Sequence, residues 1–400
     1  MAAAAVSTTP ALHEDLSDEM ALIGYNDFVF SSTASRGAAP ENSIYYAPVD
    51  KLLSGRLGAK LEADAVDRNA VTNQFTNRAK IPGVVQEKVE DYGVTDRLNK
   101  VENPAGLANP LGEARHRAML RWKEGIELTY LSQQEQQQEN GTAPYLTRGA
   151  SMWASAAAQP NSTLVVPSTY RPASSQNVSV ANVAAVKETT VRDLLQEMRE
   201  ARRAKVNVTA FCTLDFGTRF DTFFTDQEQS STSLPVRRFN HEGNVGEISI
   251  GVTSYRTRMG RVVLVESEHL NATRNAGSIT SAATTDTSTT VTCASTSGLQ
   301  PYMKVAGTGI PAGAYIVSIT NSTTFVINAA ATATNTGLTL TIGEFDHALF
   351  LDMETFVTKM NGGIDNVEFE NIGDGQKGFV KGFTSLFCSM PAYNSRIYSA

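Results

Sequence analysis

Histidine, the side chain most often used as a general base or metal ligand, is rare and scattered in this sequence. None of the five histidines stands in a His-x-x-x-His or His-Glu-x-x-His spacing, which would place two imidazoles on one helix face to bind zinc. They are His13, His116, His241, His269 and His347. The densest group of possible ligands is Glu266, Glu268 and His269, at the end of an apolar run, where three such side chains are commonplace. These spacings predict neither a metal site nor a general base.

Motifs for nucleophiles and phosphate binding are absent from the sequence as well. It contains no Gly-x-Ser-x-Gly elbow and no Gly-x-x-x-x-Gly-Lys loop. The stretch 307–309 could begin a phosphate loop, but no buried strand and helix flank it, so a β-turn is the better interpretation. Four acidic residues could bind calcium in principle: Asp365, Glu368, Glu370 and Asp374. They lack the twelve-residue loop with its closing glutamate, so a solvated acidic turn is favoured. We expect no enzyme, and no catalytic, cofactor-binding or metal-binding residue.

Composition and charge narrow the class of protein further. The formal net charge of −7 argues against a dedicated DNA-binding or RNA-binding protein, which would normally be basic. Only 19% of residues are charged, which indicates a surface that partners cover. Cys212, Cys293 and Cys388 form no Cys-x-x-Cys motif, which is typical of a chain folded in a reducing cytoplasm. We find no signal peptide and no membrane-spanning apolar run of about 20 residues.

The element that must organise the chain is a long amphipathic helix. It is predicted to begin at Pro110, where a first-turn proline is tolerated, and to end before Gly141. Its apolar face recurs every four residues at Ala114, Ala118, Trp122, Ile126 and Tyr130. Its polar face carries Glu113, Arg115, Arg117, Arg121, Lys123, Glu124 and Glu127. A helix of roughly 25 residues is near 40 Å long, enough to cross a whole domain.

Shorter elements flank this helix. Before it, the runs 43–46 and 83–85 predict an extended two-stranded excursion rather than a domain. After it, a second helix is predicted to begin near Thr190, with Thr190 and Asp193 forming a capping box. Apolar or alternating runs predict further strands at 208–212, 248–252, 261–265 and 348–351. Between 275 and 343 the only charged residues are Asp286 and Lys304, and short Thr-rich runs there predict a small all-β module.

The order of these elements resembles that of tailed-bacteriophage major capsid proteins with the Hong Kong 97-like fold. The stretches 73–81, 113–131 and 142–149 are similar to that family's post-loop strand, spine helix and following passage. The stretch 348–354 is similar to a later strand of the family, although Met353 replaces the expected proline. The resemblance spans roughly residues 20–270 and 344–398 and lies in collinearity rather than in one diagnostic motif. The segment 275–343 separately resembles the Thr- and Gly-rich, Ig-like β modules of phage structural proteins.

The resemblance implies an α+β chain with an inserted all-β domain. In chain order, its parts would be an N-terminal arm at 1–29, an extended loop (E-loop) at 30–95, a peripheral (P) domain with the spine helix at 96–185 and 366–400, an axial (A) domain at 186–274 and 344–365, and the inserted β-sandwich module at 275–343. Because the extended loop would lie over a neighbouring subunit, we expect subunit contacts at Glu62, Asp64, Asp67, Arg78 and Lys80. Simple solvated charges remain the alternative interpretation of these residues.

The implied function is that of a structural protein. Copies would form the hexamers and pentamers of an icosahedral head that encloses double-stranded DNA without sequence-specific binding, with no cofactor and no membrane. Assembly would take place in the host bacterial cytoplasm, and the product would be the virion. Portal, scaffold and decoration or cement proteins are further partners that the resemblance leaves open. The alternative is a phage tail or fibre protein for host binding, but the long helix argues against it because fibres are mostly β.

Overall fold

The computed structural model describes residues 28–51, 77–96, 110–139, 141, 144–156, 164–180, 182–225, 253–272, 278–297, 299, 303–311, 314–369 and 375–399. The chain divides into two compact units. One comprises 1–26, 88–125 and 363–382, and the other comprises 27–87, 126–362 and 383–400. In the part of the chain that the structure describes, no helix combines the length and the apolar character needed to cross a membrane.

The long helix α3 runs from Pro110 to Leu131, which confirms the predicted start and most of the predicted length. In the first unit its apolar face packs on the strands: Trp122 is buried and its indole Nε1 donates to the Lys88 carbonyl, 2.9 Å away. The strands β4 (Gln86–Val94), β16 (Phe356–Glu368) and β17 (Gln376–Cys388) belong to a four-stranded sheet of order β1-β16-β17-β4. Gly382 lies so close to the helix that a Cβ would come within 2.4 Å of the Trp122 ring.

The second unit contains a mixed six-stranded sheet of order β5-β18-β15-β6-β8-β7. Its strands are β5 (Asn177–Ser179), β6 (Val206–Cys212), β7 (Ser254–Arg256), β8 (Gly260–Glu266), β15 (Phe345–Leu351) and β18 (Ser395–Ser399). Strands β6 and β8 run parallel, whereas β15 pairs antiparallel with β6. The predicted strands at 208–212, 261–265 and 348–351 are therefore confirmed, and the one predicted at 248–252 lies outside the described residues.

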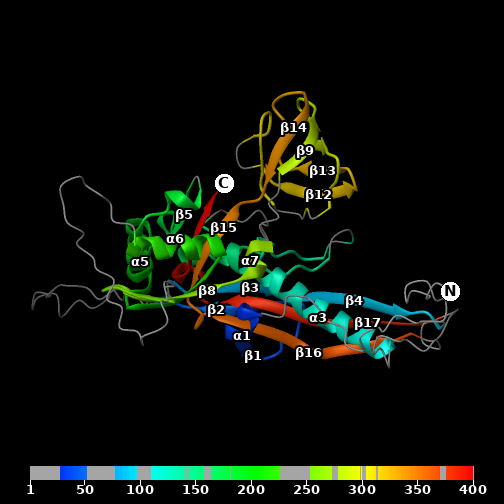
Figure 1. Ribbon diagram of the computed structural model, residues 1–400, viewed down its shortest axis with the longest axis horizontal. Coiled ribbons are helices and arrows are strands. Elements are labelled where there is room, and N and C mark those ends of the chain that lie inside the picture. Colours follow the sequence, from blue (N-terminus) through cyan, green and yellow to red (C-terminus); the bar gives the residue numbers. More distant parts are fainter. Residues whose placement is uncertain are drawn as a thin grey trace, which may run out of the picture. The chain divides into compact units, whose positions relative to one another are not determined.

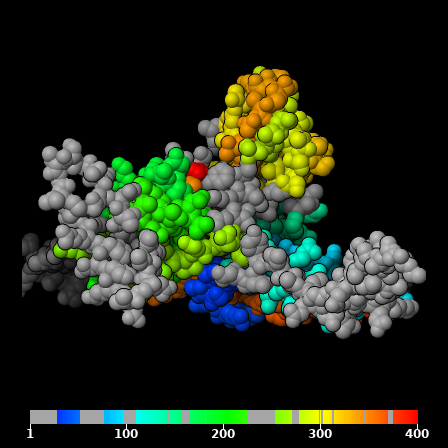
Figure 2. All heavy atoms as spheres, viewed as in Figure 1, coloured from blue at the N-terminus to red at the C-terminus, as the bar shows by residue number. Residues whose placement is uncertain are grey.

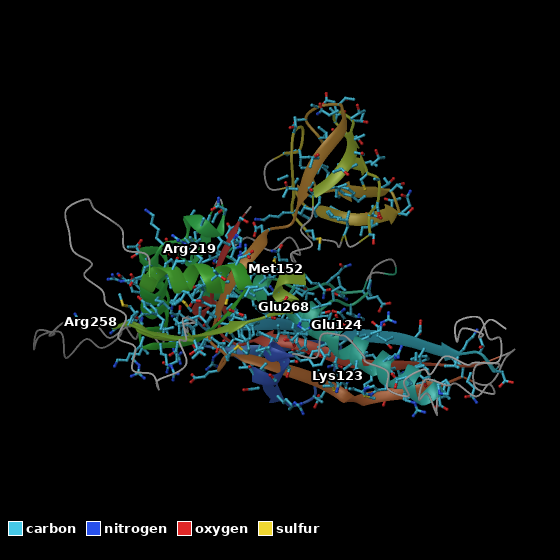
Figure 3. All side chains as sticks on the ribbon, in the orientation of Figure 1. Lys123, Glu124, Met152, Arg219, Arg258 and Glu268 are labelled. Atoms are coloured by element: carbon cyan, nitrogen blue, oxygen red, sulfur yellow. The ribbon has the colours of Figure 1, made fainter. Side chains whose placement is uncertain are left out.

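Two helices, α5 (Glu188–Arg202) and α6 (Leu214–Thr225), pack on one face of this sheet (Figure 1). They share a buried core with the strands that includes Leu195, Phe216, Val208 and Phe350. A helix was predicted near Thr190 and is present, but the predicted cap at Thr190 was wrong. The helix begins two residues earlier, after Lys187, and no side chain caps it, so the Thr190 capping box does not form. Figure 3 labels Arg258 and Glu268, which lie at opposite ends of β8.

The second unit also contains a hairpin and a short helix from the early part of the chain. Strands β2 (Ile44–Val49) and β3 (Ala79–Val84) pair antiparallel, which confirms the two strands predicted from the runs 43–46 and 83–85, whereas residues 52–76 between them lie outside the described residues. Helix α1 (Val29–Thr33) precedes β1 (Ser35–Gly37), which pairs with β16. The carboxylate of Glu127 accepts hydrogen bonds from the backbone N–H groups of Phe30 and Ser31, at 2.6 and 2.9 Å. Glu127 is fully buried, so its predicted place on the polar face of the long helix was wrong.

The β module forms a separate sheet of order β11-β14-β9-β10-β13-β12 within residues 278–342. Its strands are β9 (Ser278–Thr284), β10 (Thr290–Thr292), β11 (Val305–Ala306), β12 (Ile316–Asn321), β13 (Thr324–Ile327) and β14 (Asn335–Ile342). A buried cluster of its own, with Val291, Phe325 and Leu340 among its members, holds the sheet together. The yellow and orange atoms in Figure 2 show it as one rounded group. Short helices α4 (Ala150–Trp153) and α7 (Glu268–Ala272) complete the α-helices described.

Candidate subunit-contact sites

The two predicted contact residues that the structure describes lie beside the hairpin of β2 and β3. Arg78 precedes β3, and its Nε stands 3.4 Å from Asp50 Oδ2, with 60% of its side chain exposed. Lys80 is exposed on β3, opposite Pro48 of β2. Both side chains are therefore exposed to solvent at this hairpin. Glu62, Asp64 and Asp67 lie outside the described residues.

A cation–π cluster of Lys359, Tyr45 and Phe387, which the sequence analysis did not predict, attaches this hairpin to the neighbouring strands. The ammonium of Lys359 on β16 stands 4.2 Å from the ring centroid of Tyr45 on β2 and 5.3 Å from that of Phe387 on β17. The Tyr45 hydroxyl shares a hydrogen bond with Ser385 Oγ, 2.9 Å away. Burial raises the pKa of Tyr45 to about 12 and lowers the pKa of Lys359 from its ordinary value. The cation–π contact gives the hairpin a specific attachment to the sheet.

A buried charge cluster stands where the chain leaves the β module and enters β15. The Arg396 guanidinium bonds to Glu344 and lies 3.4 Å from Asp346 Oδ1, and all three residues are at most 5% exposed. Ser151 donates to Asp346, and Gln133 Nε2 donates to the same carboxylate at 2.9 Å. Burial raises the pKa of Asp346 although the Arg396 charge opposes the shift. The cluster fixes β15, β18 and the start of α4 together.

A second buried ion pair lies next to α4. Arg148 Nε stands 3.4 Å from Glu135 Oε1, and both side chains are at most 2% exposed. The guanidinium also covers the Trp153 ring, 4.8 Å from its centroid. Burial raises the pKa of Glu135 and lowers the pKa of Arg148, and their mutual attraction opposes both shifts. Only one feature of the sequence could have indicated such buried pairs. A charged residue that lies within a few positions of an apolar strand run can be buried with that strand, as Asp346 and Arg396 are.

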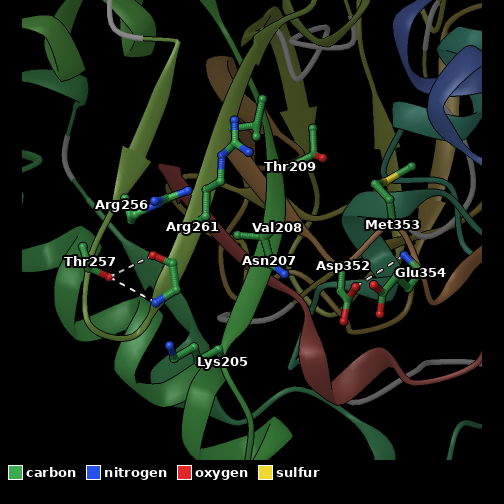
Figure 4. A pocket seen from close by; sticks show the side chains of 12 residues that line it. Lys205, Asn207, Val208, Thr209, Arg256, Thr257, Arg261, Asp352, Met353 and Glu354 are labelled. Atoms are coloured by element: carbon green, nitrogen blue, oxygen red, sulfur yellow. Dashed lines mark hydrogen bonds between the residues drawn. The ribbon is translucent and has the colours of Figure 1, made fainter.

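The charged pocket of the second unit is a cavity of about 670 Å³ at the amino ends of β6 and β8. Figure 4 shows Lys205, Arg256 and Arg261 along it, with Asp352 and Glu354 across from them. Arg256 and Arg261 are direct cross-strand partners on β7 and β8. The lining combines these cations and carboxylates with polar and apolar side chains of the same strands, among them Asn207, Thr209 and Val263.

The residues first considered for chemistry are dispersed. His116 is exposed on α3, whereas His269 and His347 are buried, the latter with Nε2 3.1 Å from Ser399 Oγ. Glu368 bonds to Arg115 at 2.9 Å. His13, His241, Glu370 and Asp374 lie outside the described residues. Within the described ranges, no three His, Cys, Asp or Glu side chains stand close enough to hold a metal ion.

Comparisons with known proteins converge on one class. A family model described as SU10 major capsid protein matches residues 3–285. The capsid of a native GTA particle is similar in fold with a TM-score of 0.54, at 10% identity and over 100% of both chains. The cyanophage Pam1 capsid gives a TM-score of 0.53 at 9% identity, over 100% of this chain and 98% of that one. Mycobacterium phage Ogopogo gives 0.51 at 9% identity, over 100% of both chains. No curated protein sequence matches this chain.

Proposed function

The chain belongs to the SU10 major capsid protein family, and from this premise we propose that its copies assemble into the hexamers and pentamers of an icosahedral bacteriophage head. Its role is structural: it is a major capsid protein of a phage virion. The observation that carries the proposal is the family match over residues 3–285. The family is a structural one and not a class of enzymes, and it does not favour the tail or fibre alternative.

The fold supports the same conclusion independently of sequence. The chain has an α+β capsid fold, since it aligns over its whole length with phage and GTA-particle capsid structures at TM-scores above 0.5. We propose that the finer arrangement is Hong Kong 97-like. In that arrangement the hairpin of β2 and β3 would be the base of the E-loop and α3 the spine helix, with the P domain at 96–185 and 366–400. The A domain would span 186–274 and 344–365, and 275–343 would be an inserted Ig-like module.

Contacts between subunits are part of the proposal. Arg78 and Lys80 are exposed next to the hairpin, as a register-setting contact with a neighbouring copy requires. Glu62, Asp64 and Asp67 would join them in the loop between β2 and β3. Double-stranded DNA would be enclosed without sequence-specific contacts, in keeping with the net charge of −7. Portal, scaffold or decoration proteins would be further partners, and assembly would take place in the bacterial cytoplasm.

The test is to express the chain and image it by electron microscopy. Shells, or rings with five-fold and six-fold symmetry, are the expected result. Trimeric rods would support the fibre alternative instead. A persistent 43 kDa monomer at high concentration, in the presence and absence of a co-expressed phage scaffold, would contradict the proposal.

A further inference from the structure

The sheet of the second unit is electrically polarised along its two parallel strands. At the amino ends of β6 and β8 lies a basic rim, formed by Lys205, Arg256 and Arg261. All three are exposed, and none forms an ion pair with a described residue. The two carboxylates across the pocket are engaged elsewhere, because Asp352 and Glu354 each stand 2.7 Å from Arg202. Among the described residues, the rim therefore has no ion-pair partner of its own.

The pairing of Arg256 with Arg261 is unfavourable for the isolated chain. The two residues are directly opposite in the antiparallel register of β7 and β8, and like charges in that position destabilise a sheet. Both point away from the face that α5 and α6 cover, since their neighbours Tyr255 and Val262 pack into the helix-covered core. An anionic group placed over the pair would relieve this repulsion.

The carboxyl ends of the same strands carry the opposite charge. Glu266 ends β8 and is exposed, and its Oε1 lies against α6, within 2.6 Å of where a Cβ on Gly217 would stand. Asp215 and Glu268 are exposed in the first turns of α6 and α7. Burial raises the pKa of Cys212 to about 12, and the nearby carboxylates of Glu266 and Asp221 add to the shift. Seven residues of strand separate the two ends by roughly 20 Å.

Helix stabilisation explains only part of the acidic end. Carboxylates in a first helical turn interact favourably with the helix dipole, which accounts for Asp215 and Glu268. Glu266 belongs to neither helix: it ends β8, and its carboxylate lies against the first turn of α6. A ring of identical subunits needs two different surface patches on each subunit, one of which binds the other patch on the next subunit. A basic rim and an acidic end on the same sheet provide such a pair of patches.

We propose that the basic rim of one copy binds the acidic end of the next copy, so that Arg256 and Arg261 lie against Glu266 and Glu268 of a second chain within each capsomer. This inference rests on the proposed function, since it names the surface by which capsid subunits form rings. A second copy is favoured as the occupant because its charge is complementary, and because every subunit carries both patches in equal number. Steering by complementary charge accelerates correct encounter and suppresses wrong register.

Charge reversal tests the contact. The first variant, R256E/R261E, keeps a like-charge pair in the sheet and so matches the wild type in intramolecular repulsion. The second variant, E266K/E268K, reverses the other patch. Each alone is expected to remain folded by circular dichroism and to form rings at least about tenfold more slowly in light scattering. The quadruple variant carries matched patches again and is expected to recover ring formation. R36E/R192E, which reverses two exposed arginines on β1 and α5, is the control with an equal change in net charge.

A neutral variant separates assembly from folding. R256Q/R261Q removes the repulsion within the sheet, so its unfolding midpoint is expected to equal or exceed that of the wild type while ring formation falls. Mixing R256E/R261E with E266K/E268K gives a sharper result. The two chains can alternate only in rings with an even number of members, so hexamers are expected and pentamers are not. Closed shells need pentamers, and the mixture is therefore expected to yield sheets or tubes.

The possible outcomes separate the two proposals. Wild-type rings together with undiminished rings from both single-patch variants would overturn the head-to-tail contact and leave the capsid function standing. Failure of the quadruple variant to recover, with each parent folded, would also overturn it. A wild-type chain that never assembles would overturn the proposed function, and this inference with it.

Discussion

At the scale of single residues, the charges that matter most to the fold are buried ones. Glu127 follows a run of charged positions on a long helix, and its spacing alone places it with them. In the folded chain it accepts two backbone N–H groups of α1, and Arg396 likewise lies among Glu344, Asp346 and Ser151 rather than at the surface. The periodicity of a helix or strand shows which of its faces is apolar and which is polar. It does not show whether a second segment of the chain will cover the polar face. This is why both residues escaped prediction.

Glu127→Gln tests the cap on α1. An amide has only one acceptor oxygen, so one of the two N–H groups of α1 would face the amide nitrogen, which is itself a donor. We expect a loss of about 1–3 kcal/mol in the free energy of unfolding, measured by urea denaturation. Glu124→Gln, on the same helix, is the matched control and is expected to change stability by less than about 0.5 kcal/mol. Equal effects of the two substitutions would contradict the capping role.

Arg396→Met tests the buried charge cluster. Removing the cation leaves Glu344 and Asp346 buried without it, and breaking such a pair costs about 3–5 kcal/mol. Burial already raises the pKa of Asp346 above its usual value of 3.8, and loss of Arg396 raises it further. A carboxyl with a raised folded pKa destabilises the fold when ionised, and that penalty fades as the pH falls through the folded pKa. The deficit of the variant should therefore be smaller at pH 5 than at pH 8, and a deficit independent of pH would contradict this account.

At the scale of elements, the sequence pattern predicted the helices and strands whose apolar residues recur with a regular period. It did not predict features that depend on contacts between segments distant in the sequence. The 22-residue helix α3 has an uninterrupted apolar stripe, β6 and β8 are rich in valine, and β15 contains the apolar run 348–351, so all four were predicted close to their true positions. The start of α5 was placed two residues late, because the capping-box pattern at Thr190 suggested a cap that the helix does not use. Neither the pocket nor the polarity of the sheet could be predicted, since both depend on which strands become neighbours.

Gly260→Ala tests the pairing of β6 with β8. A Cβ at this position would stand 1.8 Å from the Val206 carbonyl oxygen, so the two strands would have to separate at their amino ends. Overpacking of this kind costs about 1–3 kcal/mol, and we expect that loss in the free energy of unfolding. Gly363→Ala is the control, because a Cβ there meets no atom within 4 Å. A stable Gly260→Ala protein with wild-type hydrogen-exchange protection in β6 would show that the close approach is unimportant.

At the scale of the whole molecule, the β module has its own sheet and its own buried cluster. Ser278 at the start of β9 and Thr341 near the end of β14 are cross-strand partners, so their Cα atoms are about 5 Å apart. Lys304 of the module also bonds to Glu344, which follows it. The module therefore enters and leaves through one narrow connection.

Replacing residues 278–342 by a short Gly-Ser linker is expected to leave the remaining chain able to unfold cooperatively and to assemble. The physical reason is that a linker closing such a small gap costs little loop entropy. Calorimetry and electron microscopy of the shortened chain would measure both properties. Lys304→Ala, which keeps the module but removes its bond to Glu344, is the control for that one contact. An insoluble or molten product would mean that the module supports the fold of the rest.

Adjacent entry and exit strands also make this junction exchangeable. Any folded domain whose termini lie one strand spacing apart can be joined to the same two residues without moving the sheet that β15 belongs to. A single recombination event could then replace the module while the shell-forming parts stay unaltered. For the same reason the junction is suited to the display of a foreign domain, with one copy carried by every subunit of a particle.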